Sequence, residues 1–178
     1  MIDPAIGTLL AGAFALLFAS AALHKARNLA VFTELFRAYR VLPARLTIPW
    51  LVPLLEFALA VGVVLPATRG AAALAGAGLL TAYALAIGLN LARGRRDLAC
   101  GCGGVHERRP IAAWMVGRNV LLAALLGVLA LPQGMRPLQR TDLLTVVAGL
   151  AVAALLYMSA DALFGRVAPR AALWEEQR

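Results

Sequence analysis

The sequence predicts an all-α, polytopic membrane protein with about five transmembrane helices. Its 178 residues are 62% hydrophobic and their mean hydropathy is +0.81, whereas soluble globular domains are about 45–50% apolar. The hydrophobic residues form long blocks, and a helix of roughly 20 apolar residues is what crosses a bilayer. The charged residues lie mostly in short connectors between these blocks. We therefore expect a single integral membrane domain over residues 1–178.

The apolar blocks predict five spans, over residues 4–23, 48–65, 71–92, 114–131 and 143–164. The stretch before the first block contains one charged residue, Asp3, and no lysine or arginine. A cleavable signal peptide starts with positive charge, so we expect an uncleaved first span. Pro49 and Pro66 bracket the second block, and Pro132 follows the fourth. The third block is rich in glycine and alanine, and such small residues favour close packing between helices.

A short amphipathic helix is predicted over residues 29–42, directly after the first span. Its apolar side chains recur at helical spacing, and its two arginines, Arg37 and Arg40, lie off that stripe. The stripe consists of Leu29, Phe32, Leu35, Phe36 and Tyr39. This pattern is typical of a helix that lies in the membrane interface. We expect a four-helix core, a fifth flanking span and this interfacial helix.

The distribution of basic residues predicts the orientation. The formal net charge of +8 does not indicate nucleic-acid binding, because the basic residues form no single face. With five spans, thirteen lysines and arginines fall in the first loop, the third loop and the C-terminal tail, and three fall on the other side. Cytoplasmic loops carry the excess of positive charge. We therefore expect the N-terminus outside and the third loop, residues 93–113, in the cytoplasm.

The third loop contains both cysteines of the chain, Cys100 and Cys102, separated by Gly101. Two cysteines in such a CxC motif can be bridged if a turn brings their α-carbons within about 7 Å. The glycines around them permit a tight turn, and a strained, accessible disulfide is easily reduced. The five arginines of the loop favour the reactive thiolate. One hypothesis is that the two cysteines carry out thiol–disulfide exchange. Another is that they are ordinary loop residues without a chemical role.

A metal site is a further alternative for this loop. Cys100, Cys102 and His106 could hold Cu(I) or Zn²⁺, because thiolates and imidazole are ligands for these ions. A closed zinc site has four ligands, and the segment offers three. A third alternative is a membrane scaffold without catalysis.

Polar residues inside the predicted spans are the other candidates. Glu56 lies near the middle of the second span, and Arg118 and Asn119 lie about one turn into the fourth. Ionisable groups in a span usually face the bundle interior or form pairs. We expect Glu56 to pair with Arg118, or with His24 or Lys25 at the end of the first span. The pair either fixes helix packing or, with Asn119, lines a pocket for a quinone-like cofactor or a proton.

Taken together, these segments resemble the MauE branch of the DoxX-like membrane proteins, associated with methylamine utilisation. The resemblance covers about the first 130 residues. It rests on Ser20 to Lys25, Phe32, Phe36 to Pro43, Pro53 to Glu56, Cys100 to Cys102, and Arg118 with Asn119. Gly103 stands where this family is expected to have an aromatic residue after the second cysteine.

The resemblance implies a protein of the bacterial inner membrane that helps to mature disulfide-rich periplasmic proteins. The implied client is the small subunit of methylamine dehydrogenase, and the implied partner is a thioredoxin-like protein. Cys100 and Cys102 would be the redox pair of a thiol–disulfide oxidoreductase. Disulfides form in the periplasm, whereas the charge bias places the cysteines in the cytoplasm. Either electrons cross the membrane through the chain, or the orientation is reversed, or the cysteines serve another purpose.

Overall fold

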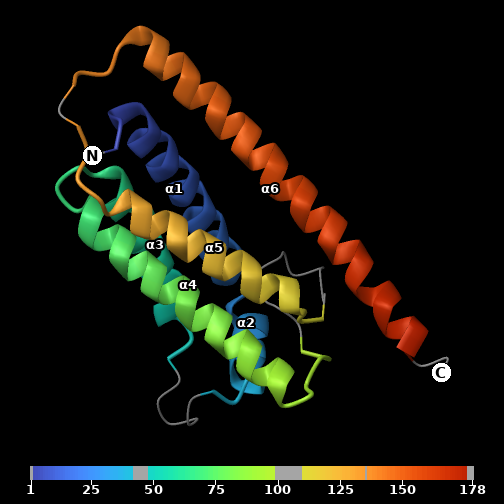
Figure 1. Ribbon diagram of the computed structural model, residues 1–178. Coiled ribbons are helices and arrows are strands. Elements are labelled where there is room, and N and C mark those ends of the chain that lie inside the picture. The colour runs from blue at the N-terminus through green and yellow to red at the C-terminus, as the bar shows by residue number, and fades with distance from the viewer. Residues whose placement is uncertain (1, 42–47, 99–109, 135, 176–178) are drawn as a thin grey trace.

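The computed structural model describes residues 2–41, 48–98, 110–134 and 136–175, with side chains described up to residue 163. Within these ranges the chain is all-α and contains six helices (Figure 1). They are α1 (Pro4–Arg27), α2 (Leu29–Ala38), α3 (Leu51–Val64), α4 (Arg69–Ala92), α5 (Ala113–Leu129) and α6 (Arg140–Glu175). The predicted all-α class is confirmed.

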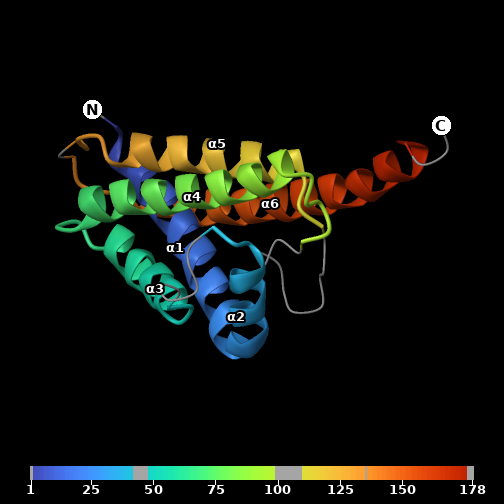
Figure 2. The same cartoon turned by 90° about the horizontal axis from the view of Figure 1, so that it is seen from below.

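Four of the helices form a closed bundle. α1 packs against α3, α3 against α4, α4 against α5, and α5 against α1. α6 packs on α1 outside this ring and runs obliquely past it, while α2 projects from the end of α1 (Figures 1 and 2). The expected four-helix core with one flanking helix is therefore present. Small residues allow the contact with α6, because a Cβ on Gly12 of α1 would meet the side chain of Leu150 at 3.2 Å.

In the part of the chain that the structure describes, three helices are long and apolar enough to cross a membrane, namely Pro4–Arg27, Arg69–Ala92 and Arg140–Leu163. The predicted spans 48–65 and 114–131 contain apolar helices of only 14 and 17 residues. At 1.5 Å per residue these helices extend roughly 21 and 26 Å, less than the hydrocarbon thickness of about 30 Å. Proline causes the shortening, because Pro49 and Pro66 flank α3 and Pro132 follows α5. The structure thus supports several apolar helices, and five complete crossings stay a prediction.

The helix predicted to lie in the interface is shorter than expected, because α2 ends at Ala38 and not at residue 42. Arg40 ends the helical conformation with a positive φ of 48°, which non-glycine residues seldom adopt within a helix. In the predicted apolar stripe, Leu29 is exposed and the other residues are half-buried. The rings of Phe32 and Phe36, one helical turn apart, lie 5.8 Å from each other. Arg37 and Arg40 are exposed, as expected.

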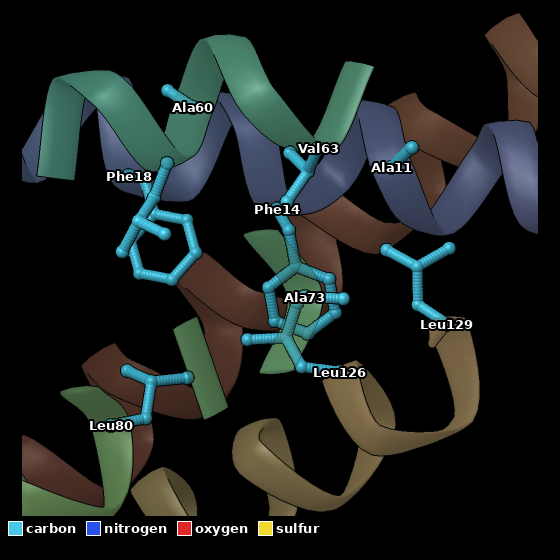
Figure 3. Close-up of a cluster of buried hydrophobic side chains, with 10 residues drawn as sticks. Ala11, Phe14, Phe18, Ala60, Val63, Ala73, Leu80, Leu126 and Leu129 are labelled. Carbon is cyan, nitrogen blue, oxygen red and sulfur yellow. The ribbon is translucent and has the colours of Figure 1, made fainter. Parts of the chain in front are cut away.

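The core of the bundle is apolar and tightly packed. Its buried side chains come from all four ring helices (Figure 3). Phe18 of α1 and Leu126 of α5 meet at Gly76 of α4, where a Cβ would approach them to 3.0 and 3.2 Å. A glycine at this point lets three helices approach closely, which matters in a bilayer because lipid offers no hydrophobic force to bring helices together.

The N-terminal end of the bundle is closed by polar contacts among three connectors. Ile2 exchanges backbone hydrogen bonds with Pro132 and Gly134 at 3.0 and 2.9 Å. The guanidinium group of Arg69 donates to Gln133 at 2.7 Å, and that of Arg136 to Asp3 at 2.8 Å. These contacts place the N-terminus, the α3–α4 turn and the α5–α6 connection at one end. The α2 helix and the base of the third loop therefore lie at the other end, which agrees with the predicted alternation of loops.

Candidate functional site

A buried ion pair joins α1 to α3 near the α2 end of the bundle. The Nζ atom of Lys25 lies 2.6 Å from Oε1 of Glu56, and their side chains are 8% and 1% exposed. Lys25 occupies the last turn of α1, which continues to Arg27, beyond the end of the predicted span at residue 23. An unpaired lysine would be too costly to bury there. Of the partners expected for Glu56, the structure selects Lys25.

Aromatic side chains complete the surroundings of this pair. The hydroxyl group of Tyr83 on α4 donates to Oε1 of Glu56 at 2.8 Å. The ammonium group of Lys25 lies 5.6 Å from the ring centre of Tyr83 and 5.7 Å from that of Phe32 on α2. Both rings offer their negative faces to the cation. The site therefore connects four helices, and both donors reach one oxygen of the carboxylate. The other oxygen, Oε2, is buried without a hydrogen-bond partner among the described residues.

Arg118 belongs to a different contact. Its guanidinium group pairs with Asp161 of α6 at 3.0 Å and lies over the rings of Trp114 and Tyr157, at 5.1 and 5.8 Å from their centres. The described contacts do not join Arg118 to Glu56, so the predicted pairing of these two residues is replaced by two separate ion pairs. One is inside the ring of four helices, and the other attaches α6 to α5.

Asn119, the next residue, faces the bundle interior. Its side chain is buried, at 3% exposure, and its Nδ2 donor has no partner among the described residues. A side-chain amide deprived of a hydrogen bond in a protein interior costs roughly 1–3 kcal/mol. The location of Asn119 in the core agrees with the expectation that intramembrane polar residues face inwards.

A second polar contact fixes α2 to the end of α4. Asn90 is fully buried, and its Nδ2 donates to the carbonyl oxygens of Tyr39 and Ala86 at 3.1 and 2.9 Å. Arg95 donates to Oδ1 of Asn90 at 3.0 Å and to the carbonyl oxygen of Ala38 at 2.9 Å. The carbonyls of Ala38 and Tyr39 belong to the end of α2, where a helix leaves acceptors unsatisfied. Asn90 of α4 and Arg95, which follows the end of α4, thus cap α2, and the sequence pattern did not predict this cap.

The cysteine segment itself, Cys100 and Cys102 with His106, lies outside the described residues. Its base is described. The backbone N–H of Ile111 donates to the carbonyl oxygen of Leu98 at 2.8 Å, so the chain enters and leaves the segment at one point. Leu98 and Ile111 are buried with Ile87 and Met115, against Tyr39 and other partly buried residues. The cysteine segment therefore starts from a packed apolar base at the α2 end of the bundle.

Tyr83 is the site residue that sequence reasoning missed. It lies in an alanine-rich apolar block in which it is the one aromatic residue. A tyrosine in a span needs a partner for its hydroxyl group when it is buried, and that requirement is the signal that could have identified it. Its partner, Glu56, is 27 residues away in the chain, so the pair could be found only by considering two helices together.

Comparison with known proteins gives one consistent result. Residues 3–132, which include α1 to α5, match the family described as Methylamine utilisation protein MauE. The chain is 36% identical to the MauE protein of Paracoccus denitrificans over 97% of this chain and 94% of that protein. It is 39% identical to that of Paracoccus versutus over 92% and 89%, and 32% identical to that of Methylophilus methylotrophus over 92% and 88%. No solved structure matches the chain.

Proposed function

The chain belongs to the MauE family, and we propose that it serves methylamine utilisation as a membrane thiol–disulfide exchange protein. The observation that carries the proposal is the family membership together with the cysteine pair, Cys100 and Cys102, in the third loop. The proposed client is a disulfide-rich periplasmic protein, in this family the small subunit of methylamine dehydrogenase. The proposed partner is a thioredoxin-like protein.

The chemistry needs only the two thiols and a partner disulfide. The thiolate of one cysteine attacks a sulfur of the partner disulfide and releases the other sulfur as a thiolate. The second cysteine then attacks the mixed disulfide, so that Cys100 and Cys102 become a disulfide and the partner becomes a dithiol. The reverse sequence oxidises a client. Arginines on both sides of the segment, such as Arg96 and Arg108, favour the attacking thiolate.

The described base of the loop supports this role. Leu98 precedes Cys100 by two residues and is buried in the packed cluster with Ile111. Because the carbonyl of Leu98 is bonded to Ile111, the cysteine segment has a fixed point of attachment beside α2. The α2 helix projects from the bundle at this end (Figure 2), and a partner protein would approach the cysteine segment from the same end.

The first test is exchange of cysteines for serines. Cys100→Ser and Cys102→Ser variants, expressed to the same level as the parent chain, are expected to abolish maturation of the disulfide-rich client, measured by its disulfide content. Ser20→Ala is a matched control, because Ser20 is an exposed, small polar residue whose hydroxyl group, among the described residues, donates to the carbonyl of Leu17 in its own helix. Full maturation with both cysteine variants would reject the redox role.

We further propose an orientation with the N-terminus outside and the third loop in the cytoplasm, within the bacterial inner membrane. The side chains support the charge bias. At the N-terminal end, Arg69 and Arg136 are engaged by Gln133 and by Asp3, and Arg136 and Arg140 are exposed. Arg37, Arg40 and Arg93 at the other end are exposed, where they can meet anionic lipid headgroups.

Labelling in intact cells with a membrane-impermeant maleimide, with and without prior reduction, decides the orientation. Labelling of Cys100 and Cys102 only after the inner membrane is opened supports the proposed orientation and requires the redox function to transfer electrons across the bilayer. Labelling in intact cells only after reduction means an outward-facing disulfide. That result would overturn the orientation and support periplasmic exchange.

A further inference from the structure

Two buried polar atoms of the four-helix ring, on Glu56 and Asn119, have no hydrogen-bond partner among the described residues. One is an acceptor, Oε2 of Glu56, and the other is a donor, Nδ2 of Asn119. Their side chains are almost completely buried, with residue exposures of 1% and 3%. Both come from helices of the four-helix ring, α3 and α5. Leaving either atom unsatisfied is costly in an apolar interior, so their relative position matters.

Helix geometry places Asn119 at the same depth as the ion pair. Phe18, Gly76 and Leu126 meet at one level of the core. Each of the three helices has a polar residue seven positions from that level in the direction of the α2 end: Lys25 on α1, Tyr83 on α4 and Asn119 on α5. Seven residues are nearly two helical turns, so each polar residue lies roughly 10 Å further along, on the same face as its apolar counterpart.

The contacts of Glu56 confirm part of this layer. Lys25 and Tyr83 both reach Oε1 of Glu56, at 2.6 and 2.8 Å, so the two side chains do lie at one level. The layer therefore has one member from each ring helix, Asn119 being the fourth. We call Lys25, Glu56, Tyr83 and Asn119 the polar layer. Arg118 is not a member, because it faces α6 and pairs with Asp161.

We propose that the polar layer binds an uncharged hydroxyl group. Its O–H donates to Oε2 of Glu56, and its oxygen accepts from Nδ2 of Asn119. A hydroxyl group fits because it supplies one donor and one acceptor from a single atom. The group is neutral because Lys25 already balances the charge of Glu56, and a further charge would be buried without compensation.

Two molecules available in a membrane carry this chemistry, an internal water and a lipid-soluble phenol or hydroquinone. Either molecule would occupy the polar layer and make the same two hydrogen bonds. The experiment therefore uses a different probe for each of them. The proposal concerns these four side chains and does not depend on the cysteines. Its failure would leave thiol–disulfide exchange untouched, and loss of exchange in the cysteine variants would leave this site untouched.

The test uses the purified full chain in lipid nanodiscs, with tetramethylhydroquinone titrated anaerobically by calorimetry. Asn119→Leu removes the donor at similar volume, and Asn119→Ala repeats the removal without added bulk. Helical circular dichroism verifies that both variants are folded. Thr81→Val is the matched control, because Thr81 is exposed on α4 and its hydroxyl group bonds within its own helix, to Ala77 at 2.8 Å.

If the hydroquinone is the occupant, the parent chain and Thr81→Val bind it equally. Both Asn119 variants then weaken binding by about tenfold, the loss expected for one hydrogen bond. If water is the occupant, the hydroquinone does not bind, and infrared spectra show an internal-water O–D band that shifts with isotopically labelled water and disappears in both Asn119 variants.

Two results would overturn the proposal. One is the absence of both signals, with neither hydroquinone binding nor an Asn119-dependent water band. The other is hydroquinone binding that both Asn119 variants keep and Arg118→Gln loses, which would place the site at the Arg118 contact with α6.

Discussion

Replacing Lys25 by methionine removes the positive charge that Glu56 faces across the interface of α1 and α3. The two charged groups are 2.6 Å apart and almost fully buried, so Glu56 would keep a carboxylate without its cation. Removal of one partner from a buried ion pair costs about 3–5 kcal/mol of unfolding free energy. Glu56→Leu leaves the ammonium group of Lys25 equally unpaired and is expected to cost about the same.

The double variant Lys25→Met with Glu56→Leu is the decisive comparison. Replacing both charges by apolar groups of similar volume is often nearly neutral. Tyr83 loses its acceptor on Glu56, a cost of about 1 kcal/mol. The double variant should therefore lie within about 2 kcal/mol of the parent chain, although the two single costs sum to roughly 6–10 kcal/mol. The coupling free energy is then at least about 4 kcal/mol.

The assay is unfolding in mixed micelles with increasing SDS, followed by helical circular dichroism. Arg37→Met is the control, because Arg37 is exposed on α2 and surface changes are usually within about 0.5 kcal/mol. Single variants with losses below about 1 kcal/mol, or a double variant as unstable as the sum of the two, would refute the argument that this pair stabilises the bundle.

Three further predictions concern packing, capping and pH. Gly76→Val is expected to destabilise the bundle by about 1–3 kcal/mol, because a Cβ at this position already meets Phe18 at 3.0 Å. Gly78→Val is the control, because a Cβ on Gly78 meets nothing within 4 Å. Equal unfolding curves for the two variants would contradict the prediction. Asn90→Ala is expected to speed amide hydrogen exchange in α2 by removing its cap at the carbonyl of Tyr39; unchanged exchange would show that the cap is dispensable. A hydrogen bond from Arg136 lowers the pKa of Asp3 below its ordinary value of 3.8. The stability from this contact is therefore present above that value and lost as pH falls through the lower folded-state pKa, and Asp3→Asn should flatten that part of the pH profile.

The sequence by itself determined the all-α class, the positions of the apolar helices and the presence of an amphipathic helix after the first. Hydropathy and helical periodicity are local properties, and they decide where a chain becomes helical in a membrane. In the predicted stripe every residue after Leu29 is half-buried, and the location of this helix in the membrane interface stays a prediction. The sequence also identified Glu56, Arg118 and Asn119 as the polar residues of the spans, because any such residue stands out against an apolar background.

Only the tertiary structure decided which partners these residues take. Glu56 had three candidate cations, and the choice of Lys25 over Arg118 depends on how α1, α3 and α5 are rotated about their axes. Hydropathy is nearly insensitive to that rotation. Asn90 shows the same limit, since its burial and its bonds to α2 follow from the docking of two helices. The pairing of charges is a long-range property, because each buried ion is compensated by whichever opposite charge the packed helices bring within reach.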